Sequence, residues 1–194
     1  MKINEKIILV SASPRRKQIL SEAGFRFDVV STEADESFAP DIPAEKVPEI
    51  LARRKVEAFG NEDPATLVIG ADTVVIVNGQ IFNKPENREQ AIEMLQNLSN
   101  TTHRVVTGVC MQAYHSLITF SDTTLVHFKA LSAEEISYYV DHFRPFDKAG
   151  SYGVQDFIGM VGIDRIEGSF YTVMGLPVHK VYEHLKPYIR FSEW

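Results

Sequence analysis

The fold of this chain is decided near its start, by the stretch Ile7-Ile-Leu-Val-Ser-Ala-Ser-Pro-Arg-Arg-Lys-Gln-Ile-Leu20. Its first four residues form an apolar run of the kind that a buried strand uses. Ser13 is a favourable helix N-cap, and Pro14 suits the first helical position. The apolar positions of this helix are Ile19, Leu20 and Ala23. Gly24 is placed to end it. The chain is therefore predicted to begin as strand, tight turn and helix.

Two adjacent arginines, Arg15 and Arg16, occupy the first turn of this helix. The helix dipole is positive there, so each cation costs about 0.3–1 kcal/mol. The hydroxyls of Ser11 and Ser13 and the free backbone N–H groups of the turn are further donors. A phosphate chain would accept hydrogen bonds from all of them, which favours anion binding. In the alternative interpretation, both arginines fold back to the surface and pair with carboxylates.

Composition places the chain among folded globular proteins. It has 194 residues, of which 44% are hydrophobic and 24% charged, enough for one domain of ordinary size or one with two lobes. The formal net charge of −6 argues against a broad basic face for a nucleic acid polymer. A small phosphorylated substrate needs only a local basic pocket, so that partner stays open.

Apolar patterning and cysteine usage indicate where the protein works. We expect no membrane span, because no apolar run reaches the required length, and no signal peptide at the N-terminus. The single cysteine, Cys110, excludes an internal disulfide and fits a cytoplasmic location. Cys110 lies in a strand-like apolar run, so a buried, inert thiol is expected.

Periodicity and turn signals predict the remaining elements. Strands are expected over residues 25–31, 103–114 and 116–128, with a hairpin over 66–82 that turns at Asn78-Gly79. Helices are expected over residues 47–59, over 132–142 behind a capping box, and over 178–188. A further helix is expected to start at the capping pair Asn87 and Gln90. Two loops rich in small residues, 145–155 and 168–177, separate the last elements.

Asp72 interrupts an otherwise buried strand of the predicted hairpin. A carboxylate there must be paired, bound to a metal or placed at a cleft, because burying it alone is very costly. Gly70, two residues earlier, indicates a bulge or a close backbone approach of the kind found beside active sites. We favour a catalytic or metal-binding Asp72 over a structural carboxylate that caps a neighbouring turn.

Other polar residues have two interpretations each. Lys55 either snorkels along its helix or reaches an anion, and Lys84 adds a cation before the next helix. Glu36, next to another acid in a loop, is simply solvated unless further acids converge on it. Gln155 carries a donor and an acceptor that suit a nucleobase edge, or it belongs to an ordinary surface loop. His103, at a strand start, is interpreted as structural.

As an ordered set, these residues resemble the Maf family of nucleoside triphosphate pyrophosphatases. The resemblance covers nearly the whole chain and is carried by Ser11-Ala-Ser-Pro-Arg-Arg16, Asp35-Glu36, Ala52 with Lys55, Gly70-Ala-Asp-Thr-Val-Val75, Lys84-Pro85, His103-x-Val-x-Thr-Gly108, Asp147-Lys-Ala-Gly-Ser-Tyr-Gly-Val-Gln155, Gly168-Ser169 and Gly175-Leu-Pro177. The first motif and the Asp-Lys-Ala-Gly loop are the most specific.

The resemblance implies an α/β fold: an elongated, mixed, strongly bent sheet flanked by helices, with two lobes and a central cleft, as in Maf and ITPase-like proteins. Residues 1–194 would form one such domain. The resemblance also implies a metal-dependent enzyme that cuts a nucleoside triphosphate to the monophosphate and pyrophosphate. The Asp147–Gln155 version of the loop is similar to the branch acting on dTTP and UTP, whereas the sister branch typically has cysteine in place of Lys148.

The family's site residues map onto this chain by motif. Asp72 corresponds to the proton acceptor, and Arg15, Thr73 and Gln155 correspond to the positions that set base specificity. As a hypothesis, Glu36 and Asp72 hold Mg²⁺ or Mn²⁺ and orient the attacking water. The cations expected to hold the triphosphate are Arg15, Arg16, Lys55 and Lys84, with Ser11, Ser13 and Lys148 as further substrate contacts. Asp156 stands where the family often has glycine, beside Gln155.

Two other expectations come from the resemblance. By analogy the protein is a homodimer, and modified pyrimidine triphosphates would fit a similar pocket. The rival hypothesis is a regulatory protein that binds nucleotide and acts on septum formation through a partner. A protein that does not hydrolyse its ligand has no need of Asp72 and Glu36 beside the arginines, which favours an enzyme.

Overall fold

The opening stretch folds as predicted. A computed structural model describes residues 2–114 and 116–191, and in it strand β2 (Lys6–Val10) is followed by helix α1 (Pro14–Glu22). The Ser13 hydroxyl accepts a hydrogen bond from the Arg16 backbone N–H, as an N-cap should. Gly24 follows the helix with a φ of 85°, the left-handed conformation that glycine adopts freely. Ala23, expected on the apolar face, is exposed.

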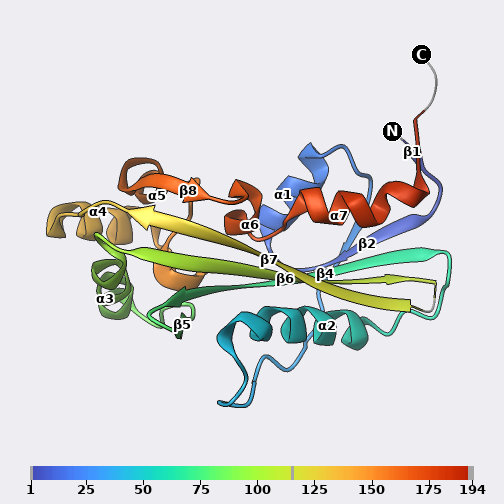
Figure 1. Cartoon of the computed structure of the whole chain (residues 1–194), viewed down its shortest axis with the longest axis horizontal. Helices are drawn as coiled ribbons and strands as arrows, with labels where there is room; N and C mark the ends of the chain where they lie inside the picture. Colours follow the sequence, from blue (N-terminus) through green and yellow to red (C-terminus); the bar gives the residue numbers. More distant parts are fainter. Residues whose placement is uncertain (1, 115, 192–194) are drawn as a thin grey trace. The chain divides into compact units, whose positions relative to one another are not determined.

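The chain alternates helices and strands along its length (Figure 1). The other strands are β1 (Lys2–Ile3), β3 (Asp28–Val30), β4 (Thr66–Val77), β5 (Gln80–Phe82), β6 (Thr102–Ala113), β7 (Ser116–Phe128), β8 (Ile163–Glu167) and β9 (Ile189–Arg190). The other helices are α2 (Val47–Phe59), α3 (Arg88–Leu98), α4 (Ala133–Phe143), α5 (Phe157–Gly162), α6 (Phe170–Met174) and α7 (Val178–Leu185). Short 3₁₀ turns are η1 (Ala44–Lys46), η2 (Ala149–Ser151) and η3 (Lys186–Tyr188).

The main sheet is mixed. Its strand order is β3-β2-β4-β6-β7-β8, and β5 pairs with β4. Strand β2 runs parallel to both neighbours, with Val10 opposite Val30 on one side and Gly70 on the other. The β4–β5 and β7–β8 pairs are antiparallel. A mixed sheet flanked by helices confirms the predicted α/β class.

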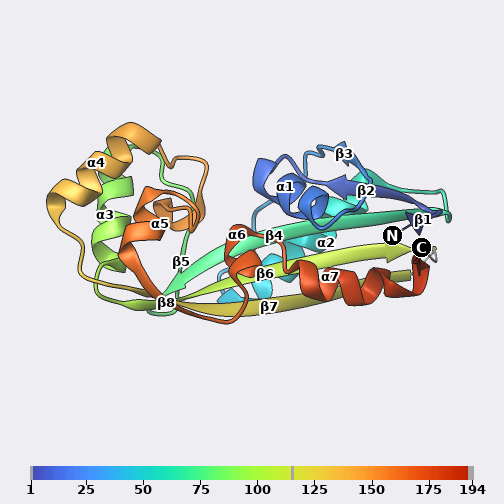
Figure 2. The ribbon, with the colours of Figure 1, turned by 90° about the horizontal axis from the view of Figure 1, so that it is seen from above.

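The chain divides into two compact units. Unit 1 comprises Met1–Asp72, Thr107–Asp122 and Gly175–Trp194, and unit 2 comprises Thr73–Val106 and Thr123–Met174. Three boundaries between the units fall within β4, β6 and β7, and the fourth follows α6. Within unit 1, α2 covers one face of the sheet while α1 and α7 cover the other (Figures 1 and 2). Within unit 2, α4 packs against α3 and α5. A single domain with two lobes and a cleft stays a prediction.

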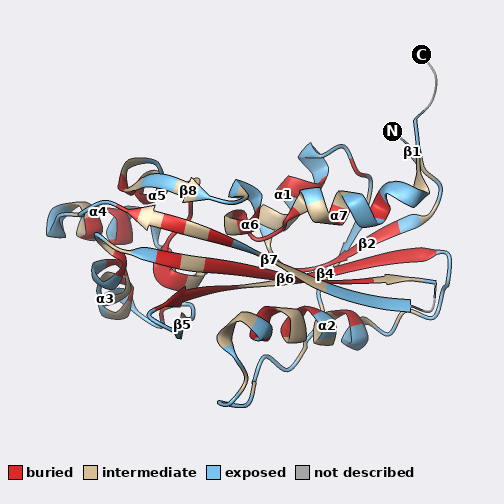
Figure 3. Ribbon diagram, in the orientation of Figure 1, coloured by how far each residue is buried: buried red, intermediate tan, exposed pale blue. Residues whose placement is uncertain are grey.

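Two glycines let α2 lie close against the sheet. A Cβ on Gly108 of β6 would lie 2.2 Å from the Pro48 carbonyl carbon, and one on Gly70 of β4 would lie 2.9 Å from the Ala52 oxygen. The predicted close approach at Gly70 is therefore confirmed. The buried residues in this layer are Ile8, Val10, Ala52, Val56, Val68 and Cys110. Figure 3 shows much of β2, β4 and β6 in red, the colour of buried residues.

Local turn and cap signals are accurate predictors in this chain. Asn78 and Gly79 both have positive φ, 49° and 82°, as a tight hairpin between β4 and β5 requires. The Gln90 N–H donates to the Asn87 side chain at 2.9 Å, which starts α3. Ser132 and Glu135 form the predicted capping box of α4.

Several elements were not predicted, and some predicted bounds differ. Helices α5 and α6 and strands β1, β8 and β9 have at most six residues each, too few for a periodic pattern to stand out. The closing helix ends at Leu185, and Pro187 then lies in a 3₁₀ turn. The turn between β6 and β7 includes residue 115, which lies outside the described residues.

Cys110 is buried, and burial raises the pKa of its thiol to about 11, so the predicted inert thiol is confirmed. Within residues 2–114 and 116–191, none of the helices combines the length and the apolar character that crossing a membrane would need.

His103 lies in an aromatic cluster of unit 2. Its Nε2 is 2.7 Å from the Tyr152 hydroxyl, and both rings pack against Phe128. All three side chains are buried. Burial, with a smaller contribution from His127, lowers the pKa of His103 from 6.5 to about 3. His103 is therefore neutral in the folded protein at neutral pH, in agreement with a structural role.

This pKa shift predicts a pH-dependent stability. The unfolded chain binds a proton at His103 below about pH 6.5, and the folded chain does not until about pH 3. The free energy of unfolding should therefore fall by up to about 1.4 kcal/mol per pH unit as the pH drops through this window. Urea unfolding at pH 4 to 7 should show a shallower dependence in His103→Gln than in the wild type. The exposed His142→Gln control should keep the wild-type slope, and equal slopes for all three proteins would contradict the assignment.

Candidate functional site

The start of α1 gathers serine and arginine side chains of unit 1. The Ser13 N–H donates to the Ser11 hydroxyl at 3.1 Å, and Arg16 Nη1 lies 3.5 Å from the same oxygen. Arg16 Nε donates to the carbonyl of Gly175 at 2.8 Å, 159 positions later in the chain. This carbonyl contact was not predicted, since no local pattern indicates which distant backbone group an arginine will bind.

Arg16 is held where its charge is costly. Desolvation lowers the pKa of its guanidinium, Asp72 raises it, the neighbouring charge of Arg15 lowers it, and Glu36 raises it. The guanidinium of Arg16 therefore interacts electrostatically with Asp72 and Glu36, the two carboxylates that the sequence analysis identified. Binding of an anion by Arg15 and Arg16 stays a prediction, but the donors that it requires lie together.

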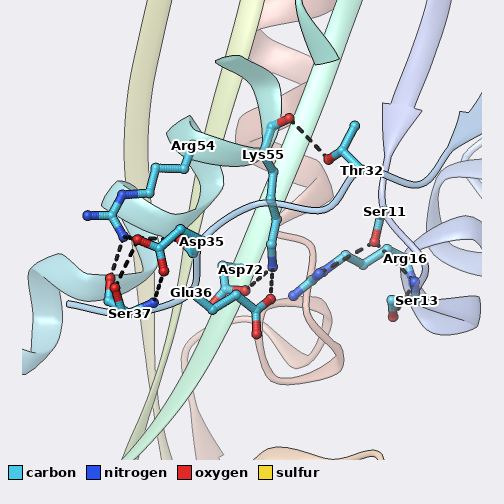
Figure 4. A network of polar contacts seen from close by, with 10 residues as sticks. All are labelled: Ser11, Ser13, Arg16, Thr32, Asp35, Glu36, Ser37, Arg54, Lys55 and Asp72. Carbon is cyan, nitrogen blue, oxygen red and sulfur yellow. Dashed lines mark hydrogen bonds and ion pairs between the residues drawn. The ribbon is translucent and has the colours of Figure 1, made fainter. Parts of the chain in front are cut away.

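Lys55 of α2 joins the two predicted catalytic carboxylates (Figure 4). Its Nζ lies 2.5 Å from Asp72 Oδ1 and 3.0 Å from Glu36 Oε1. The side chains of Lys55 and Asp72 are only 15% and 14% exposed, whereas Glu36 is 61% exposed. Glu36 was expected to matter only if another acid converged on it, and Asp72 does so through Lys55.

Strand geometry explains why Asp72 faces α2. Side chains of a strand alternate between faces, so Asp72 projects on the same side as Gly70. That side is the one on which α2 packs, as the contacts of a Cβ at Gly70 with Ala52 and Val56 indicate. Lys55, one turn beyond Ala52, is thereby brought to the carboxylate.

Glu36 and Asp72 suit a hard divalent cation. Both offer carboxylate oxygens, and both converge on one positive charge, the ammonium of Lys55. Mg²⁺ is commonly held by one or two carboxylates together with water and substrate phosphates. Among the described residues, no group of three His, Cys, Asp or Glu side chains is arranged to hold a metal ion. The two carboxylates fit the kind of site that a nucleotide's own phosphates complete.

The other predicted residues lie in unit 2. Lys148 pairs with Asp147 at 2.7 Å and lies 3.6 Å from Asp156. The Asp156 carboxylate also accepts a hydrogen bond from the Tyr139 hydroxyl at 2.8 Å. Asp156 starts α5, yet its side chain does not cap that helix. It binds Tyr139 and Lys148 instead, a role that the sequence did not indicate.

Gln155 has an amide oxygen that is buried without a hydrogen-bond partner among the described residues. A buried acceptor of this kind normally has a partner, so Gln155 Oε1 is suited to accept from a ligand. Lys84 is exposed and follows Asn83, whose carbonyl accepts a hydrogen bond from the Gly150 N–H at 3.1 Å. The Lys84 segment thus lies beside the loop that carries Lys148 and Gln155.

The structure thus brings the predicted residues into two groups. Unit 1 holds Ser11, Ser13, Arg15, Arg16, Glu36, Lys55 and Asp72. Unit 2 holds Thr73, Lys84, Lys148 and Gln155. Within the first group, Lys55 contacts Glu36 and Asp72 directly. Thr73, in the second group, is half-buried and directly follows Asp72 on β4. The functional role of every one of these residues stays a prediction.

Comparison with known proteins gives a consistent result. The model of the family described as "Maf-like protein" matches residues 6–188. A dTTP/UTP pyrophosphatase of Porphyromonas gingivalis is 52% identical over 190 residues, which cover 94% of each chain. That of Bacteroides thetaiotaomicron is 46% identical over 184 residues, covering 93% of this chain and 95% of the relative.

Among solved structures, the Ham1 protein of Staphylococcus aureus is similar to this chain with a TM-score of 0.48 and 19% identity. The likeness covers 64% of this chain and 72% of that one. The family model matches most of the chain, and relatives well above 30% identity align with it across nearly their full length. Together these matches establish the family. This chain belongs to the Maf family.

Proposed function

We propose that this protein hydrolyses dTTP and UTP to the nucleoside monophosphate and pyrophosphate, using a divalent cation. The relatives that are 46–52% identical over more than nine-tenths of the chain are named dTTP/UTP pyrophosphatases. Such an activity would remove nucleotides from the pool, and modified pyrimidine triphosphates are candidate substrates besides the two standard ones.

The observation that carries the proposal is the Lys55 cluster. Asp72 and Glu36 come from a strand and a loop, and the same ammonium contacts both. Asp72 also lies close enough to Arg16 to raise the pKa of its guanidinium. Two carboxylates beside a cationic helix start can supply both the base and the charge neutralisation that phosphoanhydride hydrolysis needs.

In the proposed reaction, water attacks the α-phosphorus. A new bond forms between that phosphorus and the water oxygen, the bond to the bridging oxygen breaks, and pyrophosphate leaves with the electron pair. Asp72 orients the water and accepts its proton. Arg15, Arg16 and Lys55 bind the phosphate oxygens and stabilise the negative charge of the leaving group.

Glu36 and Asp72 would hold the divalent cation, Mg²⁺ or Mn²⁺, through their carboxylate oxygens. When bound, the cation polarises phosphoryl oxygens and helps to neutralise their charge. Lys55 holds the two carboxylates together and balances their charge within one side-chain cluster.

We assign base recognition to Gln155, Thr73 and Arg15, and further substrate contacts to Lys84 and Lys148. Thymine and uracil both carry an N3–H donor between two carbonyl acceptors. The buried Oε1 of Gln155 is an acceptor that such a donor would satisfy. A base without a matching donor would leave that oxygen unpaired, which is one way to discriminate among nucleotides.

Location and assembly complete the proposal. We propose that the protein acts in the cytoplasm, where its single buried cysteine stays reduced. We also propose a homodimer, by analogy with the family.

The first test is pyrophosphate release from a panel of nucleoside triphosphates by the purified protein. Release from dTTP and UTP should require Mg²⁺ or Mn²⁺ and stop on addition of a chelator, with little release from purine triphosphates. Turnover of purines in preference would keep the reaction and refute the assigned base specificity. No release from any nucleotide by a folded sample would favour the regulatory nucleotide-binding protein.

Asp72→Asn should lower kcat for dTTP by about 10²- to 10⁴-fold, because an amide cannot accept the proton. The amide oxygen can still accept from Lys55, so nucleotide affinity measured by calorimetry should change little. Glu57→Gln on the exposed side of α2 makes the same change of charge and should retain wild-type turnover. Near wild-type turnover in Asp72→Asn would remove Asp72 from the mechanism.

Arg16→Ala should weaken dTTP binding by about tenfold or more, as expected for the loss of charge-assisted hydrogen bonds to phosphate. The matched control is Arg26→Ala, since Arg26 is exposed and lies outside the cluster. Calorimetric titration with dTTP gives the affinities, and thermal unfolding shows whether losing the Gly175 contact alters stability. Unchanged affinity in Arg16→Ala would argue against a phosphate-binding role.

A further inference from the structure

The loop that carries Glu36 is held by two consecutive residues of α2. Lys55 Nζ lies 3.0 Å from the Glu36 carboxylate oxygen Oε1. Arg54 instead binds the backbone on either side of Glu36. Arg54 Nη1 donates to the Asp35 carbonyl at 3.1 Å and to the Ser37 carbonyl (Figure 4). One guanidinium nitrogen therefore contacts the residue before Glu36 and the residue after it.

The same loop is closed by its own side chains. The Ser37 N–H donates to Asp35 Oδ1 at 2.9 Å, and the Ser37 hydroxyl donates to Asp35 Oδ2 at 2.9 Å. The Asp35 carboxylate is thus turned towards Ser37, and its Oδ2 lies 3.8 Å from Arg54 Nη1. Glu36 is the carboxylate of this loop that contacts Lys55.

Glu36 needs such support because it is 61% exposed and has a flexible side chain. A carboxylate that works in catalysis must be held close to its productive position, and ordering it costs conformational entropy at the moment of reaction unless the loop is already fixed. The Lys55 contact fixes only the tip of Glu36. The Arg54 contacts fix the backbone from which its side chain projects.

We propose that Arg54 is the positioning residue for Glu36, acting through the carbonyls of Asp35 and Ser37. This inference rests on the proposed function of Glu36, but the contact between Arg54 and the loop does not. Arg54 does not contact the substrate but fixes the position of Glu36. Glu36 would in turn hold the divalent cation and help to orient the attacking water.

The neighbouring arginine provides a matched control. Arg53 points to a different side of α2, where its Nε lies 2.7 Å from Glu57 Oε1, and both side chains are about half exposed. Arg53→Met and Arg54→Met therefore remove the same charge from adjacent positions of one helix. Only the second change removes contacts with the Glu36 loop.

The first measurement is amide hydrogen exchange of the wild type and both variants, without nucleotide or metal. Peptides that cover residues 34–38 should exchange about tenfold faster or more in Arg54→Met, because the loop loses its anchor on α2. Arg53→Met should match the wild type in the same peptides. Equal protection of this loop in all three proteins would overturn the proposal.

The second measurement is steady-state hydrolysis of dTTP. Arg54→Met should lower kcat by about 10- to 100-fold and raise the Mg²⁺ concentration needed for half-maximal rate, as loss of a supporting contact to a metal-binding carboxylate does. KM for dTTP at saturating Mg²⁺ should stay within about threefold, because the phosphate-binding arginines are intact. A loop that loses protection while kcat and the Mg²⁺ requirement match those of Arg53→Met would overturn the positioning role.

A conservative variant guards against a loss of fold. Arg54→Lys keeps a cation that can donate to a carbonyl but lacks the planar fork, so it should recover part of the loop protection and of kcat. If Arg54→Met unfolds, Arg54→Lys is compared with Arg53→Met instead. Hydrogen exchange of residues 34–38 that is the same in both variants would refute the proposal. If the wild type releases no pyrophosphate, the proposed function fails, and hydrogen exchange still decides whether Arg54 holds the loop.

Discussion

The ion pairs of Lys55 are the interaction on which the candidate site depends. A poorly exposed carboxylate such as Asp72 is tolerated in a strand only with a partner, and Lys55 provides it from the adjacent helix. That partnership depends on how closely α2 approaches the sheet, which glycines at 70 and 108 permit. Gly70 and Gly108, which have no side chains, thus allow Lys55 to come within contact distance of Asp72. Backbone packing, a feature of the fold alone, thereby sets the geometry of the charges.

Opposite charges lie close together in the candidate site of unit 1 and compensate one another in part. Arg16 is desolvated, which works against its charge, and Asp72 and Glu36 compensate in part. Lys55 is shared between the same two acids. The two carboxylates, Asp72 and Glu36, therefore compensate the cations Arg15, Arg16 and Lys55 only in part. The negative charge of a bound phosphate chain would compensate the remainder.

Features set by neighbouring residues could be predicted from the sequence. The caps at Ser13, Asn87 and Ser132, the Asn78-Gly79 turn and the α2 helix all follow from local hydrogen bonding and backbone preference. Contacts between distant residues could not be predicted in the same way, as with Arg16 and the Gly175 carbonyl. The interruption of a buried strand indicated Asp72, and the Maf motifs added Glu36, because the resemblance carries information that periodicity lacks. The contacts of Arg54 with the Glu36 loop, and those of Asp156 with Tyr139 and Lys148, follow only from three-dimensional packing.

The place of Asp156 limits how this loop can evolve. A Cβ at Gly153 would lie 2.5 Å from an Asp156 carboxylate oxygen, and the three nearest atoms it would meet all belong to Asp156. Tyr139 and Lys148 hold that carboxylate in place, so it cannot easily move aside. The tolerance of position 153 for a side chain is therefore conditional on the residue at position 156. We therefore expect substitutions at the two sites to be interdependent, since a smaller residue at position 156 would make room for a side chain at position 153.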